Sequence, residues 1–176
     1  NNKIKIFFGV FGSSNDYRKG VDLLIKSLNI LDKDSFELVI ASKNSLKENV
    51  SFDLINLEYI NTEKELSKVY NLCDIIVLAS RLDNLPNIAL EAQSCGKPIV
   101  AYNVGGISDI IIDGFNGYLI KPFNYKNFAK KLKKLIKNKN IRLKFQQNAI
   151  KSAKKNWSEK NIVNKYKVLF KNLKVN

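Results

Sequence analysis

Histidine is absent from the sequence, and only two of its 176 residues are cysteine. Without histidine, the chain cannot supply the imidazole base of a serine or cysteine hydrolase triad. Cys73 and Cys95 form no metal-ligand pattern, and both lie in apolar segments. Buried free thiols in a reducing cytosol are therefore the favoured interpretation.

Methionine is also missing, and the chain begins at Asn1, so we expect it to be a piece of a longer protein. No apolar run reaches the ~18 residues of a membrane-spanning helix, and no N-terminal signal pattern is visible. The length and the 45% hydrophobic content fit one globular domain. We expect a single domain over residues 1–176, with a sheet-bearing core over 1–123 and helices over 124–176.

Acidic residues are nearly absent from residues 121–176, where 18 Lys and Arg accompany a single acid, Glu159. Residues 1–120 are balanced, with 12 Lys and Arg against 15 Asp and Glu. Lysines surround an apolar stripe at 132, 135 and 136, a pattern that resembles a basic helix at an anionic membrane surface. A solvated face is the favoured alternative for residues 124–174. Nucleic acid is disfavoured, because the lysines lack interleaved arginine and aromatic side chains.

Strand-like and helix-like segments alternate through the first two thirds of the chain. The predicted strands cover residues 3–11, 36–41, 55–60, 74–79, 98–102 and 117–120, and the predicted helices cover 21–31, 63–72, 87–94 and 108–112. This alternation predicts an α/β fold with a doubly wound parallel sheet, which resembles a Rossmann fold. Ligands of such sheets bind beyond the carboxyl ends of the strands, where the polar loops 12–20 and 80–87 are expected.

The loop over residues 12–20 opens a helix and ends with two adjacent cations, Arg18 and Lys19. A helix start favours anions through its free amide groups and its dipole, so the loop is a candidate diphosphate clamp. It lacks the residue order of a Walker loop. Solvated loop charges are the alternative interpretation.

Two carboxylates, Asp83 and Glu91, are separated by seven residues in the second loop and the helix that follows it. Glu91 interrupts an apolar helix, where a carboxylate is costly unless it is paired or meets a ligand. A vicinal diol such as that of ribose could donate two hydrogen bonds to it. A carboxylate favoured by the helix dipole is the alternative. Paired glycines at 105 and 106 indicate either a close approach to a ligand or a tight turn.

An Asp-x-Asp sequence at Asp32 and Asp34 has the form of a metal-binding motif. It lies between the end of a predicted helix and the start of a strand, away from the carboxyl ends of the sheet. We interpret it as a turn, and the sequence predicts no metal site.

Several motifs in order resemble the C-terminal half of the group 1 glycosyltransferases, the retaining family-four enzymes of the GT-B fold. They are Asp83-x7-Glu91, Ser94-Cys-Gly-Lys-Pro-Ile-Val-Ala101, Val104-Gly-Gly106 and Asn116-Gly117. The resemblance runs from about residue 7 to residue 123, and more loosely to the end. The sequence departs from the family at three positions: Asp83 replaces a glutamate, Asn84 replaces a common glycine, and Ser13 stands where many members carry an arginine.

The resemblance implies a role for each matching residue. Glu91 would hold the donor ribose and Asp83 the hydroxyls of the transferred sugar. Arg18 and Lys19 would hold the diphosphate and stabilise the leaving nucleotide. The remaining donor-binding residues would be Asn87 and Ile88, whose amides cap the phosphates, with Leu85, Gly105, Gly106 and Ser13. No metal or cofactor is implied beyond the UDP-sugar or GDP-sugar donor.

The resemblance further implies hexosyl transfer to a saccharide or lipid-linked acceptor in surface polysaccharide or glycolipid synthesis. The acceptor would bind an N-terminal domain absent from this chain, so we expect the isolated piece to be inactive. Its place would be the cytoplasm or the inner face of the membrane. Two alternatives stay open: a related nucleotide-sugar epimerase, and a non-catalytic basic module that binds nucleic acid or anionic lipid through residues 121–176.

Overall fold

The fold is built on a six-stranded parallel sheet in the order β3-β2-β1-β4-β5-β6. A computed structural model describes residues 3–10, 16–42, 46, 50–57, 60 and 62–173. The strands are β1 (Ile4–Val10), β2 (Phe36–Ser42), β3 (Asp53–Leu57), β4 (Ile75–Leu78), β5 (Ile99–Tyr102) and β6 (Gly117–Ile120). The strand order reverses between β1 and β4, which creates the crevice where ligands of open α/β sheets bind. The predicted doubly wound sheet is confirmed.

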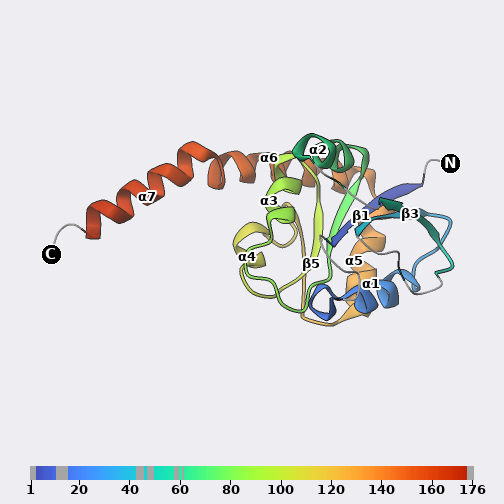
Figure 1. Cartoon of the computed structure of the whole chain (residues 1–176). Helices are drawn as coiled ribbons and strands as arrows, with labels where there is room; N and C mark the ends of the chain where they lie inside the picture. The colour runs from blue at the N-terminus through green and yellow to red at the C-terminus, as the bar shows by residue number, and fades with distance from the viewer. Residues whose placement is uncertain are drawn as a thin grey trace.

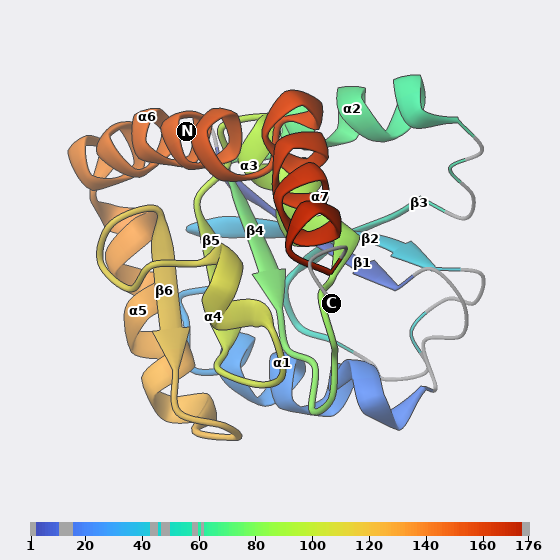
Figure 2. The ribbon, with the colours of Figure 1, turned by 90° about the vertical axis from the view of Figure 1, so that its left-hand side faces the viewer.

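Helices cover both faces of this sheet (Figure 1). They are α1 (Val21–Leu28), α2 (Glu63–Leu72), α3 (Asn87–Ser94), α4 (Ile107–Ile110), α5 (Tyr125–Lys137), α6 (Lys139–Asn156) and α7 (Glu159–Leu173), with a short 3-10 helix, η1 (Tyr17–Lys19). Figure 2 shows α1 and α5 on one side of the sheet and α2, α3 and α6 on the other. The domain therefore has three layers, with the sheet in the middle.

Alternating side chains of β1 supply both halves of the core. Ile6 and Phe8 pack in the cluster that includes α1 and α5, whereas Phe7 packs in the cluster that includes α2, α3 and α4. All residues of β4 are buried, as the absence of a polar face in its sequence predicts. The apolar runs that looked like central strands are thus covered on both sides.

Local sequence signals account for most helix boundaries. Thr62 and Glu65 form a reciprocal capping box at the start of α2. The start of α3 follows Pro86, and the helix stops before Gly96, whose φ of 67° suits a residue without a side chain. Asp32 accepts a hydrogen bond from the amide of Asp34, so this segment is the predicted turn.

Some predicted boundaries are wrong by two or three residues. α1 ends at Leu28 rather than at residue 31. Leu31 is buried like the apolar residues of the helix, but it lies in the turn after the helix, where Ile30 is exposed. The third strand starts at Asp53 rather than at residue 55, in parallel register with Glu37 of β2. Pairing with a neighbouring strand therefore extends it beyond its apolar residues. The strand ends at Leu57 rather than at residue 60, which lies outside it, and residues 58 and 59 lie outside the described part.

The apolar stripe of α5 belongs to the core. Leu132 and Leu135 are fully buried and Ile136 is 8% exposed, in the same cluster as α1. The surrounding lysines are left on the outer face of the helix, with most of them exposed. This stripe is therefore not available to a membrane, and the solvated-face interpretation accounts for the pattern in α5.

The last helix, α7, projects away from the domain (Figures 1 and 2). None of its residues, all of which the structure describes, is buried. The predicted helix is confirmed, but most of its apolar side chains are exposed: Tyr166, Leu169 and Phe170 are more than half exposed. Within the described residues, no helix is long and apolar enough to cross a membrane.

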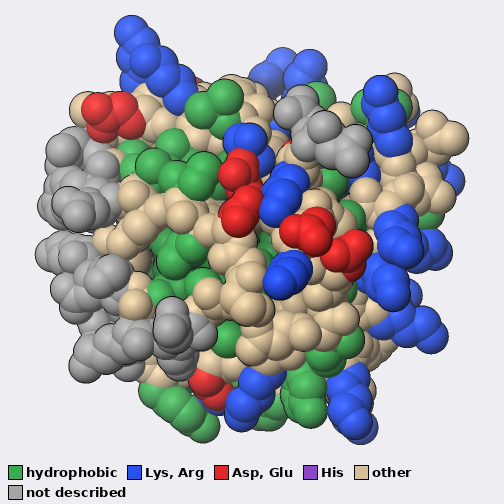
Figure 3. Space-filling model, turned by 90° about the vertical axis from the view of Figure 1, so that its right-hand side faces the viewer, with side chains coloured by type: hydrophobic (Ala, Val, Ile, Leu, Met, Phe, Trp, Pro, Cys, Tyr) green, Lys and Arg blue, Asp and Glu red, His purple; other side chains and the backbone are tan. Residues whose placement is uncertain are grey.

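Ion pairs occupy the amino ends of the strands, opposite the ligand-binding edge. Lys3 pairs with Asp53 at 2.9 Å, and Lys5 pairs with Glu37 at 2.6 Å. Figure 3 shows this side of the molecule, with acidic and basic side chains adjacent near its centre and basic ones along its right edge. Charges of opposite sign thus meet one another on this side.

The contrast between α5 and α7 predicts unequal costs for the same substitution. Leu132→Ala removes a fully buried side chain, which costs roughly 2–5 kcal/mol of unfolding free energy. Leu169→Ala removes a side chain that is 51% exposed, so we expect a change within about 0.5 kcal/mol. Urea unfolding of both variants measures the difference. Equal losses would contradict the burial of α5 against the sheet.

Candidate functional site

Two polar loops meet at the carboxyl ends of β1 and β4. The amide of Arg81 donates a hydrogen bond of 2.7 Å to the carbonyl of Arg18. The Arg81 guanidinium donates two hydrogen bonds of 2.7 Å to Asp22 on α1 and lies 3.9 Å from the ring centre of Tyr17. These bonds hold the pKa of Asp22 below its usual range. Arg81 therefore ties the 80–87 loop to η1 and α1.

Three glycines allow the loops to pack backbone against backbone. A Cβ atom at Gly20 would overlap the carbonyl oxygen of Ala79, and one at Gly105 would overlap that of Asp83. The amide of Gly106 donates a hydrogen bond of 2.6 Å to the carbonyl of Asn84. Gly105 and Gly106 therefore pack directly against the loop that carries Asp83. The sequence analysis considered only a close approach to a ligand or a simple tight turn for these two glycines.

Two of the predicted site residues, Lys19 and Asp83, form an ion pair. Lys19 Nζ lies 3.1 Å from Asp83 Oδ2, and the two side chains are 29% and 15% exposed. Asp83 Oδ2 also accepts a hydrogen bond of 3.3 Å from Ser80. The segments that carry these groups are 64 residues apart in sequence. The predicted proximity of the two loops is confirmed.

Arg18 lies at the outer edge of the same region. Its guanidinium donates hydrogen bonds of 3.1 and 2.8 Å to the two oxygens of Asp16, and its side chain is 68% exposed. These hydrogen bonds lower the pKa of Asp16. Both cations of the predicted clamp thus have a carboxylate partner.

Glu91 accepts a hydrogen bond from Tyr70, a residue of α2. The phenol oxygen lies 2.7 Å from Glu91 Oε2, and Tyr70 is 1% exposed. Burial, and then the hydrogen bond to Glu91, raise the pKa of Tyr70 well above its usual range. The sequence indicated only that Tyr70 was one of the apolar positions of a helix.

Two adjoining cavities join the predicted residues into one site. One, of about 470 Å³, is lined by Lys19, Leu66, Asp83, Leu85, Pro86, Asn87, Ile88 and Glu91. The other, of about 420 Å³, is lined by Arg18, Lys19, Leu82, Asp83, Asn84 and Gly105. Lys19 and Asp83 line both. Of the other predicted residues, Gly106 supports the loop from behind, and Ser13 lies outside the described residues.

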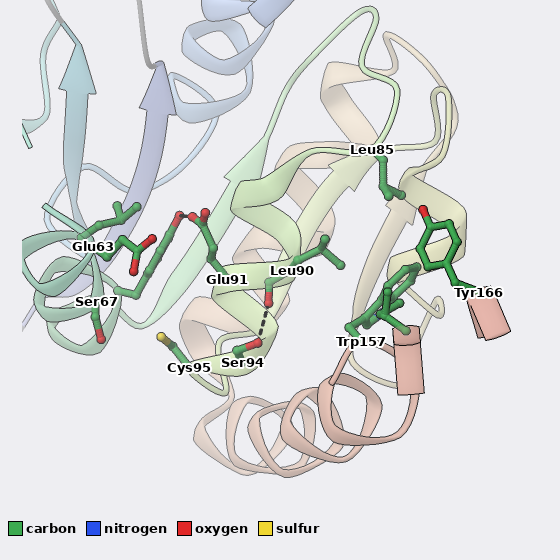
Figure 4. Close-up of a pocket in the computed structure, with 12 residues that line it drawn as sticks. Glu63, Ser67, Leu85, Leu90, Glu91, Ser94, Cys95, Trp157 and Tyr166 are labelled. Atoms are coloured by element: carbon green, nitrogen blue, oxygen red, sulfur yellow. Dashed lines mark hydrogen bonds between the residues drawn. The ribbon is translucent and has the colours of Figure 1, made fainter. Parts of the chain in front are cut away.

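A third, larger groove of about 730 Å³ crosses the exposed face of α3. Figure 4 shows Glu63 and Ser67 of α2 on one side of this face and Trp157 and Tyr166 on the other. Glu91 lines both this groove and the 470 Å³ cavity. The groove therefore continues the site toward α7.

Chemically, the site offers two cations, two carboxylates and the amino end of α3. No side-chain hydrogen bond caps the start of this helix, and its first residues, Asn87 and Ile88, line the 470 Å³ cavity. Within the described residues, no three His, Cys, Asp or Glu side chains gather as metal ligands do. Such a site suits a ligand that combines an anionic group with neighbouring hydroxyls.

Residues 3–152 match the family model of the group 1 glycosyl transferases. The chain belongs to this family. An uncharacterized glycosyltransferase of Methanocaldococcus jannaschii is 32% identical over 166 residues, which cover 92% of this chain and 47% of that protein. The chain thus spans about half the length of the curated relatives it matches.

Solved structures of several glycosyltransferases have a similar fold over most of this chain. The C-terminal domain of a group 1 glycosyl transferase, LpcC from Francisella tularensis, matches with a TM-score of 0.76 and 24% identity, over 89% of this chain and 87% of that one. S. aureus TarM in complex with Fondaparinux, α-GlcNAc-glycerol and UDP matches with a TM-score of 0.77 and 22% identity, over 96% of this chain and 35% of that one. The fold is therefore that of a C-terminal GT-B domain.

Gly105 and Gly114 provide a matched test of loop packing. Both have positive φ, 53° and 73°, so alanine costs about 1–2 kcal/mol at either position. At Gly114 a Cβ atom meets nothing within 4 Å, whereas at Gly105 it would overlap Asp83. We expect Gly105→Ala to cost about 1–3 kcal/mol more than Gly114→Ala in urea unfolding. Similar costs would contradict the tight contact between the two loops.

Proposed function

We propose that this chain forms the donor site of a hexosyltransferase that uses a UDP-sugar or GDP-sugar. The observation that carries the proposal is the pair of cavities at the β1–β4 crevice, in which Lys19, Asp83 and Glu91 line a common surface. Membership of the family supports it. The complex of TarM with UDP supports a uridine nucleotide as one donor class.

The diphosphate binds between Lys19, Arg18 and the start of α3. Lys19 and Arg18 are paired with Asp83 and Asp16. A diphosphate carries more negative charge than either carboxylate, so it draws both cations to itself. This releases Asp83 to accept hydrogen bonds from the hydroxyls of the sugar. The same cations stabilise the charge that develops on the leaving nucleotide, without a metal ion or cofactor.

The ribose binds at Glu91. Its carboxylate is partly exposed at the junction of two cavities, so a vicinal diol can reach it. A hydrogen bond to a charged acceptor contributes roughly 1.5–3 kcal/mol. Glu91 is therefore the residue on which nucleoside affinity depends most.

The acceptor is a saccharide or a lipid-linked saccharide, as in surface polysaccharide or glycolipid synthesis on the cytoplasmic side of the membrane. The saccharide ligands of TarM support this class. The acceptor is bound by an N-terminal half, since the relatives are about twice as long as this chain. The transfer retains the anomeric configuration, as the resemblance to the retaining family-four enzymes implies.

Calorimetric titration with UDP, GDP and ADP tests the site. We expect saturable binding of one nucleotide, weakened roughly tenfold or more by Lys19→Ala and by Glu91→Ala, because each removes a charge-assisted contact. Lys133→Ala is the control: it removes one charge from the exposed face of α5 and should leave affinity unchanged. Binding that neither site substitution weakens would place the nucleotide elsewhere.

The isolated chain should not transfer sugar. Because the acceptor site lies in the other half, incubation with a UDP-sugar or GDP-sugar and a saccharide acceptor should give no glycosidic product by mass spectrometry. A full-length relative serves as the positive control. Detectable product from this chain alone would contradict the assignment of the acceptor to another domain.

A further inference from the structure

Tyr70 contacts Glu91, the residue proposed to bind the ribose, from behind the site. Its hydroxyl donates the 2.7 Å hydrogen bond to Glu91 Oε2 and is the only group within the described residues that does so. Tyr70 lies on α2 and Glu91 on α3, so the bond joins two helices on the same face of the sheet. It also connects the core to a carboxylate that lines two cavities.

The position of the Tyr70 hydroxyl is fixed by packing. The ring is 1% exposed and stands edge-on to Phe7 of β1, with ring centres 5.5 Å apart and planes at 85°. A tyrosine has only two side-chain torsions, and both are held by the surrounding core. The donor therefore stays in one place whether or not a ligand is present.

Glu91, in contrast, has a long and flexible side chain on a partly exposed helix face. Its Oε2 atom is occupied by Tyr70, whereas Oε1 contacts no hydrogen-bond donor in the described part of the chain. A carboxylate has capacity for about four hydrogen bonds, so acceptor sites remain on the side that faces the cavity. One hydrogen bond to Oε2 thus determines where Oε1 points.

We propose that Tyr70 is a positioning residue that holds Glu91 ready to accept the vicinal hydroxyls of the donor ribose. This inference rests on the donor site proposed above and adds a residue that acts through Glu91 without touching the nucleotide. The loss of side-chain freedom in Glu91 occurs on folding, so it does not weaken nucleotide binding. The elevated pKa of Tyr70 keeps the phenol protonated, so the donor persists throughout the neutral and mildly alkaline range.

Tyr70→Phe removes the hydroxyl and keeps the ring, so it separates positioning from packing. Immobilising a flexible side chain on binding reduces affinity by roughly threefold to tenfold, which is the loss expected for whichever of UDP, GDP and ADP binds best. Affinity for the 2′,3′-dideoxy form of the same nucleotide should not change, because it offers no diol to Glu91. The preference for ribose therefore shrinks. In a Glu91→Ala background, which removes the acceptor of the Tyr70 hydroxyl, Tyr70→Phe should produce no further loss.

Tyr118→Phe is the matched control, since it removes the hydroxyl of another buried tyrosine, on β6 against Phe145 and away from Glu91. Its ribose preference should equal that of the unmodified chain, and thermal unfolding verifies that all variants are folded. Equal weakening of the ribo and dideoxy forms by Tyr70→Phe would indicate general damage and overturn the inference. So would an unchanged ribose preference.

The same titrations distinguish failure of this inference from failure of the donor site. If Glu91→Ala reduces the ribose preference and Tyr70→Phe does not, the donor site stands and the role of Tyr70 is refuted. If the unmodified chain binds none of the three nucleotides, or binds one without any preference for ribose, the donor site at Glu91 is refuted and the inference with it.

Discussion

Close contact between main chains at the β1–β4 crevice is the constraint on which the site depends. The carbonyl groups of Ala79, Asp83 and Asn84 approach glycine backbone so closely that a side chain would not fit at Gly20 or Gly105. Backbone contacts place a loop more firmly than long charged side chains can, because few torsions remain free. Asp83 and Lys19 are therefore presented from fixed main chain.

Charge neutralisation is the second property of the site. Its cations, Lys19 and Arg18, carry intramolecular carboxylate partners, so the crevice does not hold bare positive charge. In the proposed donor site, exchange of Asp83 for a diphosphate at Lys19 couples anion binding to the release of Asp83.

The sequence predicted the sheet and its strand segments, because buried parallel strands and amphipathic helices leave periodic patterns. Eight of the ten residues predicted for the site line the two cavities, because the loops that carry them follow strand ends. Tyr70 and Arg81 were missed. Each contacts a partner more than 20 residues away through its polar atoms, and neither composition nor spacing records such a contact.

The partner of an amphipathic helix is equally invisible to periodicity. The basic helix α5 and the basic helix α7 have similar patterns, yet one is packed in the core and the other is uncovered. A pattern specifies which face is apolar and leaves open what lies against it. The membrane-like interpretation of residues 132–136 arose from that ambiguity, and burial against the α1 side of the sheet resolved it.

The projection of α7 has a consequence for the energetics of the whole chain. A helix of 15 residues with few tertiary contacts, made mainly to the end of α6 and Trp157, is close to the length at which isolated helices are marginal in water. Its folding is therefore only weakly coupled to that of the sheet domain, and its backbone can exchange hydrogen with solvent without any opening of the core. The chain thus carries two levels of stability: a cooperative α/β body that ends near Trp157 and a terminal helix that contributes almost nothing to it.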